Sequence, residues 1–267
     1  MKIFIKPILA VIIFCIMQLL AGMVFTLFSS TPQDVILNRP GLFATSIMVS
    51  GILTVGILYW MHMFSPRTFD PRRVNWNYAY LGIIGVLLGI LVVDLLSEKL
   101  KLPDLMQLEF IGLSQNRLGV LAIAIVGPIV EEVVFRASVL GYMLRHEVGQ
   151  WTAIAVSAIL FGLVHFNPAQ IPAAIIIGML LGIIYVKSHS VILTSIIHII
   201  NNSLAVYEMR VFGGLIKDFS LTNIMGESLA ELYILVCALL CFVFLRDYMK
   251  KYHRIKNIHK HHHHHHH

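Results

Sequence analysis

Charged residues are scarce in this sequence: Asp, Glu, Lys and Arg make up only 13% of its 267 residues, against about a quarter in soluble domains. Cysteine is scarce too, and Cys15, Cys237 and Cys241 lie in apolar runs without the spacing of a metal site or a disulfide framework. We interpret them as small apolar packing residues, because a free cysteine behaves as a hydrophobe. These absences exclude a water-soluble globular domain and a disulfide-stabilised scaffold.

Much of the sequence consists of long apolar runs. Hydrophobic residues form 58% of the chain and the mean hydropathy is +0.81, while about 20 apolar residues suffice for one helical crossing of a bilayer. The sequence therefore predicts an all-α, polytopic integral membrane protein with about eight transmembrane helices. We expect them at residues 3–28, 42–63, 78–96, 118–144, 151–166, 171–186, 191–209 and 229–249, of which 151–166 and 171–186 are the shortest.

These runs indicate one helical membrane domain over residues 1–260. The histidine run His261–His267 at the end of the chain is interpreted as an expression tag. Within the expected helices, small residues recur at a spacing of four from Gly85 to Gly89 and from Gly178 to Gly182. Such a spacing lets neighbouring membrane helices approach closely, so both patterns predict tight packing.

Lys and Arg predict the orientation of the helices, because cytoplasmic flanks carry an excess of both residues. With the N-terminus inside, thirteen fall on the cytoplasmic side and six on the other, which predicts that both termini are cytoplasmic. Orientation and the anionic inner leaflet then explain the net charge of +6, so a lipid bilayer and no nucleic acid is the expected partner. The thirteen are Lys2, Lys6, Arg67, Arg72, Arg73, Arg145, Lys187, Arg246, Lys250, Lys251, Arg254, Lys256 and Lys260; the six are Arg39, Lys99, Lys101, Arg117, Arg210 and Lys217.

Two carboxylates and a guanidinium lie near the middle of the fourth apolar run. Ionisable groups at that depth cost about 2.5 to 3.5 kcal/mol each, so they are functional candidates. Glu132 and Arg136 are four residues apart and share a helical face, which predicts an ion pair. Glu131 points about a third of a turn away and is left without a local cation, which suits a general base. Pro128 cannot donate a backbone hydrogen bond and should kink the helix one turn earlier. A purely structural ionic brace between helices is the alternative.

Two further polar pairs occur in later apolar runs. Phe161 and His165 share one helical face, and His198 and Asn202 share another, since each pair is four residues apart. Taken alone, each could be a hydrogen-bonded core residue or a bridge between helices. Polar groups in three neighbouring spans need partners inside hydrocarbon, and the nearest partners are one another. We therefore expect one shared polar cavity.

The three motifs together resemble a known family. Glu-Glu-x-x-x-Arg, Phe-x-x-x-His and His-x-x-x-Asn occur in the order found in the CAAX-protease and bacteriocin-processing family, also called Abi, of glutamate-type intramembrane peptidases. The resemblance covers about residues 118–209, which would be the catalytic core. It implies an eight-helix fold, a bacterial or archaeal cell membrane, and hydrolysis of a peptide bond in a membrane-associated or lipidated peptide or protein.

The same resemblance implies a role for each site residue. Glu131 would be the base that activates a water molecule, and His165 would help to hold that water. His198 and Asn202 would stabilise the oxyanion of the tetrahedral intermediate. Glu132 and Arg136 would brace the site. No cofactor is expected, because a base, a water ligand and two donors suffice for hydrolysis.

Other protease designs find little support in the sequence. The nearest approach to His-Glu-x-x-His is His146–Gln150, which lacks the second histidine. A Gly-x-Ser-x-Gly elbow is absent, and Asp94 has no second membrane aspartate beside it. Glu131, His165 and His198 are residue types that suit zinc, so metal binding remains an alternative.

The three motifs can form a single site only if they lie at similar depths in the membrane. At a rise of about 1.5 Å per residue, His165 would lie too far from Glu131 unless the following turn, residues 167–172, is sunk into the protein. We predict that this turn is partly buried, because non-helical backbone at depth is tolerated where it lines a cavity. A proton-coupled transporter and a non-catalytic membrane scaffold or immunity protein are the alternative functions, although no internal repeat typical of carriers is found.

Overall fold

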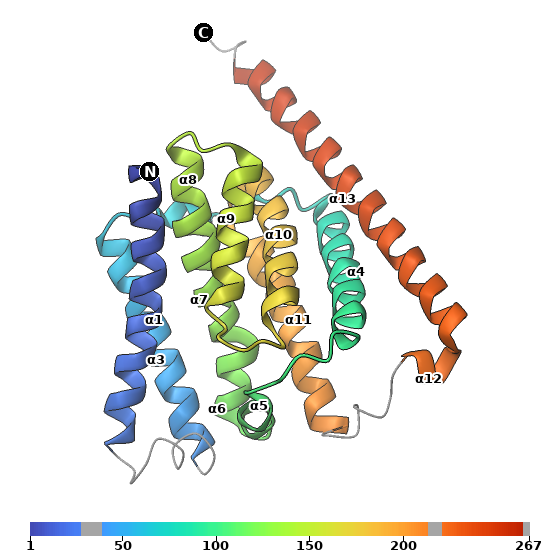
Figure 1. Ribbon diagram of the computed structural model, residues 1–267. Helices are drawn as coiled ribbons and strands as arrows, with labels where there is room; N and C mark the ends of the chain where they lie inside the picture. The colour runs from blue at the N-terminus through green and yellow to red at the C-terminus, as the bar shows by residue number, and fades with distance from the viewer. Residues whose placement is uncertain (28–38, 213–220, 264–267) are drawn as a thin grey trace.

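The computed structural model describes residues 1–27, 39–212 and 221–263, and the side chains of all of these except 212, 221 and 253–263. Every regular element in these ranges is helical (Figure 1). The all-α prediction is therefore confirmed. The segment interpreted as a tag, 261–267, lies outside the residues whose side chains are described, and so does Lys217.

Seven helices in the described ranges are long and apolar enough to cross a membrane, which confirms a polytopic membrane protein. Proline begins two of them, since its fixed φ suits a first helical turn: Pro40 at the start of α3 and Pro172 near the start of α10. The crossings are α1 (Ile5–Thr26), α3 (Pro40–Trp60), α4 (Ala79–Glu98), a composite helix over Arg117–Arg145, α10 (Ile171–Ser188), α11 (Val191–Phe212) and α13 (Glu227–His263).

The fifth expected crossing is shorter than the others. It is α9 (Gln150–Leu163), with 14 residues, which at about 1.5 Å per residue spans about 21 Å of a core about 30 Å thick. The polar turn after Leu163 ends the helix before its length reaches the thickness of a hydrocarbon core. The expected eight crossings are thus seven full ones and one partial one, whereas α10, the other short run, reaches 18 residues.

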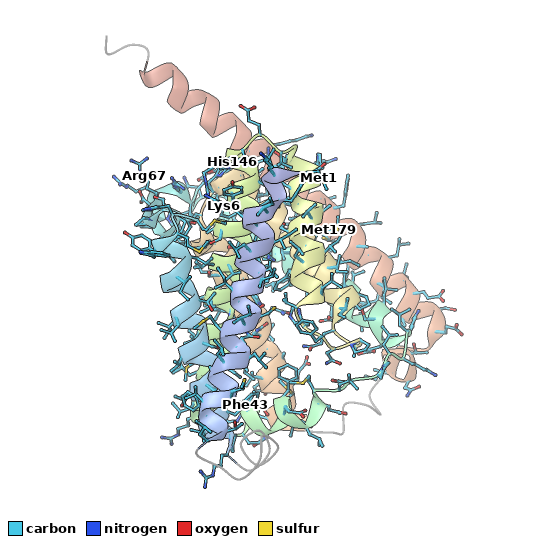
Figure 2. The ribbon with its side chains drawn as sticks, turned by 60° about the vertical axis from the view of Figure 1, so that its left-hand side comes forward. Met1, Lys6, Phe43, Arg67, His146 and Met179 are labelled. Atoms are coloured by element: carbon cyan, nitrogen blue, oxygen red, sulfur yellow. The ribbon has the colours of Figure 1, made fainter. Side chains whose placement is uncertain are left out.

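The long helices run back and forth between the two ends of the bundle. In Figure 1, α1 begins and α13 ends at the same end, which we call the terminal end. At the opposite end lie α5 (Gln107–Ser114) and α12 (Leu221–Met225), and we call it the α5 end. Figure 2 shows Lys6, Arg67 and His146 at the terminal end and Phe43 at the α5 end.

Small residues bring the helices together as predicted. A Cβ on Gly178 of α10 would lie 3.1 Å from the Cα of Ala158 in α9, and a Cβ on Gly89 of α4 would lie 2.7 Å from Leu180 in α10. Neither position has room for a larger side chain without displacing its neighbour. The two glycine patterns therefore place α10 tightly between α9 and α4.

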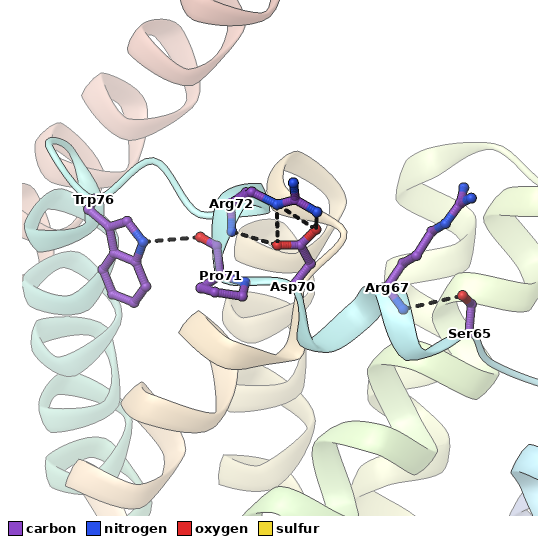
Figure 3. Close-up of polar contacts among 6 residues, drawn as sticks. All are labelled: Ser65, Arg67, Asp70, Pro71, Arg72 and Trp76. Atoms are coloured by element: carbon purple, nitrogen blue, oxygen red, sulfur yellow. Dashed lines mark hydrogen bonds and ion pairs between the residues drawn. The ribbon is translucent and has the colours of Figure 1, made fainter.

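Between α3 and α4 at the terminal end, two short helical turns, η2 (Pro66–Phe69) and η3 (Pro71–Arg73), follow one another. The carboxylate of Asp70 accepts from the backbone N–H of Arg72 and from its guanidinium, both at 2.9 Å (Figure 3). These hydrogen bonds hold the pKa of Asp70 below its usual range. The Oγ of Ser65 accepts from the N–H of Arg67, and the Nε1 of Trp76 donates to the carbonyl of Pro71.

Side chains tie this connection to the rest of the terminal end. The Nη2 of Arg145 donates to the carbonyl of Met63 at 2.7 Å. The Nη1 of Arg73 donates to the carbonyl of His189 at 2.8 Å. The Oγ of Ser190 donates to the carbonyl of Thr68 at 3.2 Å, and the hydroxyl of Tyr252 to the carbonyl of Arg73 at 3.0 Å. The connection thereby covers the terminal ends of the central helices.

Candidate active site

The interior of the bundle contains a cavity of about 840 Å³. Glu131, His165, His198 and Asn202 all line it, so the structure brings the four expected catalytic residues to one space. They come from the composite helix, the turn after α9, and α11. The other walls are formed by α1, α3, α4, α5, α10 and the segment between α4 and α5.

The composite helix carries the paired glutamates on an irregular backbone. Residues Ala122–Val126 and Val133–Leu140 are π-helical, and α7 (Gly127–Glu132) lies between them. The first π-helical segment lies where Pro128 is expected to disturb the helix, and the second follows the glutamates. Such π-helical turns occur frequently at functional sites.

Glu132 and Arg136 form the ion pair that their spacing predicts. The Nε of Arg136 lies 3.2 Å from the Oε1 of Glu132, and both side chains are fully buried. The guanidinium carbon of Arg136 also lies 4.7 Å from the ring centroid of Phe161, where a cation interacts favourably with the π-electrons. Glu132 is therefore engaged in the protein interior and does not line the cavity.

Glu132 has a second partner that sequence reasoning missed. Its Oε2 accepts from the Nδ1 of His198 at 2.9 Å. A carboxylate only accepts hydrogen bonds, so this contact places a proton on Nδ1 and fixes the orientation of the imidazole. The sequence could not reveal the pair, because the two residues are 66 positions apart and meet only through the packing of α11 against α7.

Glu131 differs from Glu132 in its surroundings. It is partly exposed and faces the cavity. Within the described part of the chain, its Oε2 is shielded from solvent and has no hydrogen-bond partner. One turn of the helix therefore presents two carboxylates with different environments: Glu132 neutralised by neighbours, and Glu131 available to a molecule in the cavity.

His165 lies just beyond the end of α9, half-buried and facing the cavity. Its Nδ1 donates to the carbonyl of Phe161 at 2.8 Å, and its ring meets that of Phe161 edge to face at a centroid distance of 5.0 Å. A carbonyl only accepts, so Nδ1 carries the proton and Nε2 is left for the cavity. Phe161 thus positions the histidine, as their shared helical face indicates.

The turn after His165 is partly buried, as predicted. Asn167 is fully buried, and residues 168–172 are partly buried. The Oδ1 of Asn167 accepts from the N–H of Leu105, and its Nδ2 donates to the Oδ1 of Asp104, both at 2.9 Å. The same Nδ2 donates to the Oε1 of Gln170 at 3.0 Å. Asn167 therefore joins the turn to the segment that leads from α4 to α5, a contact that sequence reasoning also missed.

Asn202 makes a hydrogen bond that follows from Pro128. In the π-helical segment, the N–H of Gly127 pairs with the carbonyl of Ala122, and the next such bond would join residue 128 to Ile123. Proline has no N–H, so the carbonyl of Ile123 needs another donor. The Nδ2 of Asn202 donates to it at 2.9 Å. One proton of the amide is thereby used, and the side chain of Asn202 also lines the cavity.

Comparison with known proteins gives one family match. Residues 114–204, about a third of the chain, match the family described as Type II CAAX prenyl endopeptidase Rce1-like. These residues carry an Rce1-like domain. The resemblance noted in the sequence is thus confirmed, and the domain contains every one of the six expected site residues. No curated protein and no solved structure was found to match the chain.

The match of residues 114–204 to the Rce1-like family supports a CAAX-type protease, which is a hydrolase, and implies a peptide or protein as substrate. The domain supplies the chemistry-bearing residues, whereas α1, α3 and α4, which precede it, complete the cavity. Among the described residues, no group of three or more His, Cys, Asp and Glu side chains is placed to hold a metal ion.

Proposed function

We propose that the protein is a metal-independent intramembrane endopeptidase that cleaves a membrane-associated or lipidated peptide or protein. The observation that carries this proposal is the contrast between the paired glutamates. Glu132 is buried against Arg136 and His198, whereas Glu131 faces a cavity of about 840 Å³ beside His165. A carboxylate without a fixed partner, in a space large enough for water and a peptide, is the arrangement that a general base requires.

In this mechanism a water molecule lies between Glu131 and the Nε2 of His165. Glu131 accepts a proton from the water as its oxygen attacks the carbonyl carbon of the scissile peptide bond. The carbonyl oxygen becomes an oxyanion, which accepts hydrogen bonds from His198 and from the second amide proton of Asn202. Glu131 then gives the proton to the leaving nitrogen as the carbon–nitrogen bond breaks, so the glutamate is regenerated.

His198 can serve this role only in one protonation state. Its Nδ1 proton is committed to Glu132, so a hydrogen bond to the oxyanion must come from Nε2–H. Both nitrogens then carry protons, and the imidazolium is stabilised by the adjacent carboxylate. The imidazolium of His198, held in place by Glu132, thus supplies positive charge at the point where negative charge develops.

The test is turnover by the purified protein in detergent, measured with a fluorogenic peptide library that contains lipidated and unlipidated members. We expect Glu131→Gln to lower kcat by about 10²- to 10⁴-fold, the range for loss of a general base. Glu147→Gln, an isosteric change in an exposed loop at the terminal end, is the matched control and should retain full turnover. Full turnover by Glu131→Gln would overturn the proposal.

A chelator added to the wild-type reaction separates the two hydrolytic mechanisms. We expect turnover to survive chelation, because the proposed reaction needs only protein groups and water. Turnover that is lost with the chelator and restored by zinc would replace the glutamate mechanism with a zinc mechanism at Glu131, His165 and His198.

We also propose that the terminal end lies on the cytoplasmic side. Ten of the described basic residues belong to that end, and the excess of Lys and Arg marks cytoplasmic flanks. They are Lys2, Lys6, Arg67, Arg72, Arg73, Arg145, Lys187, Arg246, Lys250 and Lys251.

A further inference from the structure

Among the residues that the structure describes, the cavity around Glu131 reaches one end of the bundle. Its lining residues extend from the level of Phe14 and Glu131 to Phe43, Glu98 and Glu208, which lie near the α5 ends of α3, α4 and α11. None of its lining residues, among those described, belongs to the connections at the terminal end. In the part of the chain that the structure describes, the cavity therefore opens toward the α5 end.

The terminal end is closed over the same helices by hydrogen bonds between distant segments. Arg145 bonds to Met63 and Arg73 to His189, and Ser190 bonds to Thr68. These contacts join the α3–α4 connection to the end of the composite helix and to the α10–α11 connection. A substrate approaching from the terminal end would have to break them before reaching Glu131.

The two ends also differ in charge. The terminal end carries the ten basic residues named above and, among described acids, Asp70, Glu147 and Asp247, whereas the α5 end carries five described basic residues, Arg39, Lys99, Lys101, Arg117 and Arg210. Acidic residues gather toward the α5 end, and these are Asp94, Glu98, Asp104, Glu109, Glu208, Glu227 and Glu231. Positively charged flanks remain in the cytoplasm and acidic flanks contribute little to orientation, so this asymmetry directs the α5 end away from the cytoplasm.

The rim of the opening is apolar as well as charged. Leu100, Leu102, Leu105 and Leu108 lie in and beside the segment between α4 and α5, with exposed fractions of 56%, 40%, 62% and 68%. Adjacent charged residues such as Lys99 and Asp104 alternate with them. Exposed leucines beside charges are placed as expected for a segment at the boundary between hydrocarbon and water, so the opening lies at the surface of one leaflet.

We infer that the cavity opens at the outer leaflet, and that the substrate is a membrane-anchored peptide whose scissile segment lies on the extracytoplasmic side. The inference that the occupant is a substrate rests on the proposed peptidase function. The direction of the opening does not depend on that function. A chain presented only from the cytoplasm would meet the closed terminal end. The product released into water would leave on the outer side.

Cysteine accessibility in intact cells tests the direction of the opening. Cys15, Cys237 and Cys241 are first replaced by alanine, and one cysteine is then introduced by Glu98→Cys at the opening or by Arg67→Cys at the terminal end. A membrane-impermeant maleimide should label the Glu98→Cys protein in intact cells as fully as in permeabilised cells. The Arg67→Cys protein should be labelled only after permeabilisation. The reverse pattern, or equal labelling of both in intact cells, would overturn the inference.

Two reporter substrates test the side from which a substrate is taken. Each carries one membrane helix and the same cleavable segment, placed outside in one reporter and inside in the other. Cleavage of only the outside reporter by the wild type, and of neither by Glu131→Gln, supports the inference; cleavage of the inside reporter overturns it. If neither reporter is cleaved while labelling places Glu98 outside, the peptidase proposal fails for anchored substrates and the orientation stands.

Discussion

The buried contact between Glu132 and Arg136 allows a quantitative prediction. Glu132→Gln keeps the size of the side chain but removes its negative charge, so the fully buried guanidinium of Arg136 is left without a counter-ion. Removing one partner of a buried ion pair costs about 3 to 5 kcal/mol. We expect Glu132→Gln to lower the free energy of unfolding by that amount and Tm by on the order of 10 °C.

A second change should reverse the loss of stability. In the double variant Glu132→Gln/Arg136→Met, both buried charges are gone and the methionine fills a similar volume. Replacing a whole buried pair is often close to neutral, so the double variant should unfold within about 1 kcal/mol of the wild type. Turnover should stay about 10²-fold low, because His198 then lacks the carboxylate that orients it.

Thermal unfolding in detergent, followed by circular dichroism, measures the stability of all three proteins, and the peptide assay measures turnover. Glu147→Gln is the control for a change from glutamate to glutamine outside the pair. The reasoning fails if Glu132→Gln unfolds at the wild-type temperature, or if the double variant is no more stable than Glu132→Gln alone.

Three further predictions concern other contacts. Asn167→Ala should destabilise the protein by about 3 kcal/mol, because three hydrogen bonds are lost and one partner is a carboxylate, whereas Gln115→Ala, an exposed amide, should change Tm by less than about 2 °C. Asn202→Ala should lower kcat by about 10²- to 10³-fold, as for loss of one oxyanion donor, with a small change in KM. Arg72→Met should raise the pKa of Asp70 toward that of an unpaired aspartate, measured by carboxyl NMR titration.

Each of these predictions can fail separately. An unchanged Tm for the Asn167 variant would mean that the α4–α5 segment is not held by its side chain. Wild-type kcat for the Asn202 variant would remove the amide from the oxyanion site. Because the pKa of Asp70 is lowered in the folded protein, its contribution to stability is present above the unfolded pKa and is lost as pH falls through the folded pKa. The Arg72→Met variant keeps the backbone N–H, so an unchanged Asp70 pKa would show that the guanidinium is not the cause.

Features that depend on local spacing could be predicted from the sequence. The contact between Glu132 and Arg136 follows from a separation of four residues on one helix. The membrane class follows from composition, and the position of the crossings follows from apolar length. The tight packing at Gly178 follows from a pattern within one helix.

Features that depend on how distant helices pack could not be predicted. Glu132 meets His198 across 66 positions, and Asn167 meets Asp104 across 63. Each of these polar groups could have satisfied its hydrogen bonds with several others in the sequence. The partner of each group is determined only by the three-dimensional arrangement. The same arrangement places the polar turn after α9 so that this helix is too short for a full crossing.

The arrangement of the cavity walls has a consequence for how such a protein can change. The residues proposed to act on the peptide bond lie in the Rce1-like segment, 114–204, whereas Gln18 of α1 and Ser46 and Ser50 of α3 line the same cavity from outside it. Under the proposed function, recognition and reaction would draw on different parts of the polypeptide. Substitutions in the first two helices can reshape what the cavity accommodates while the groups that break the bond keep their positions.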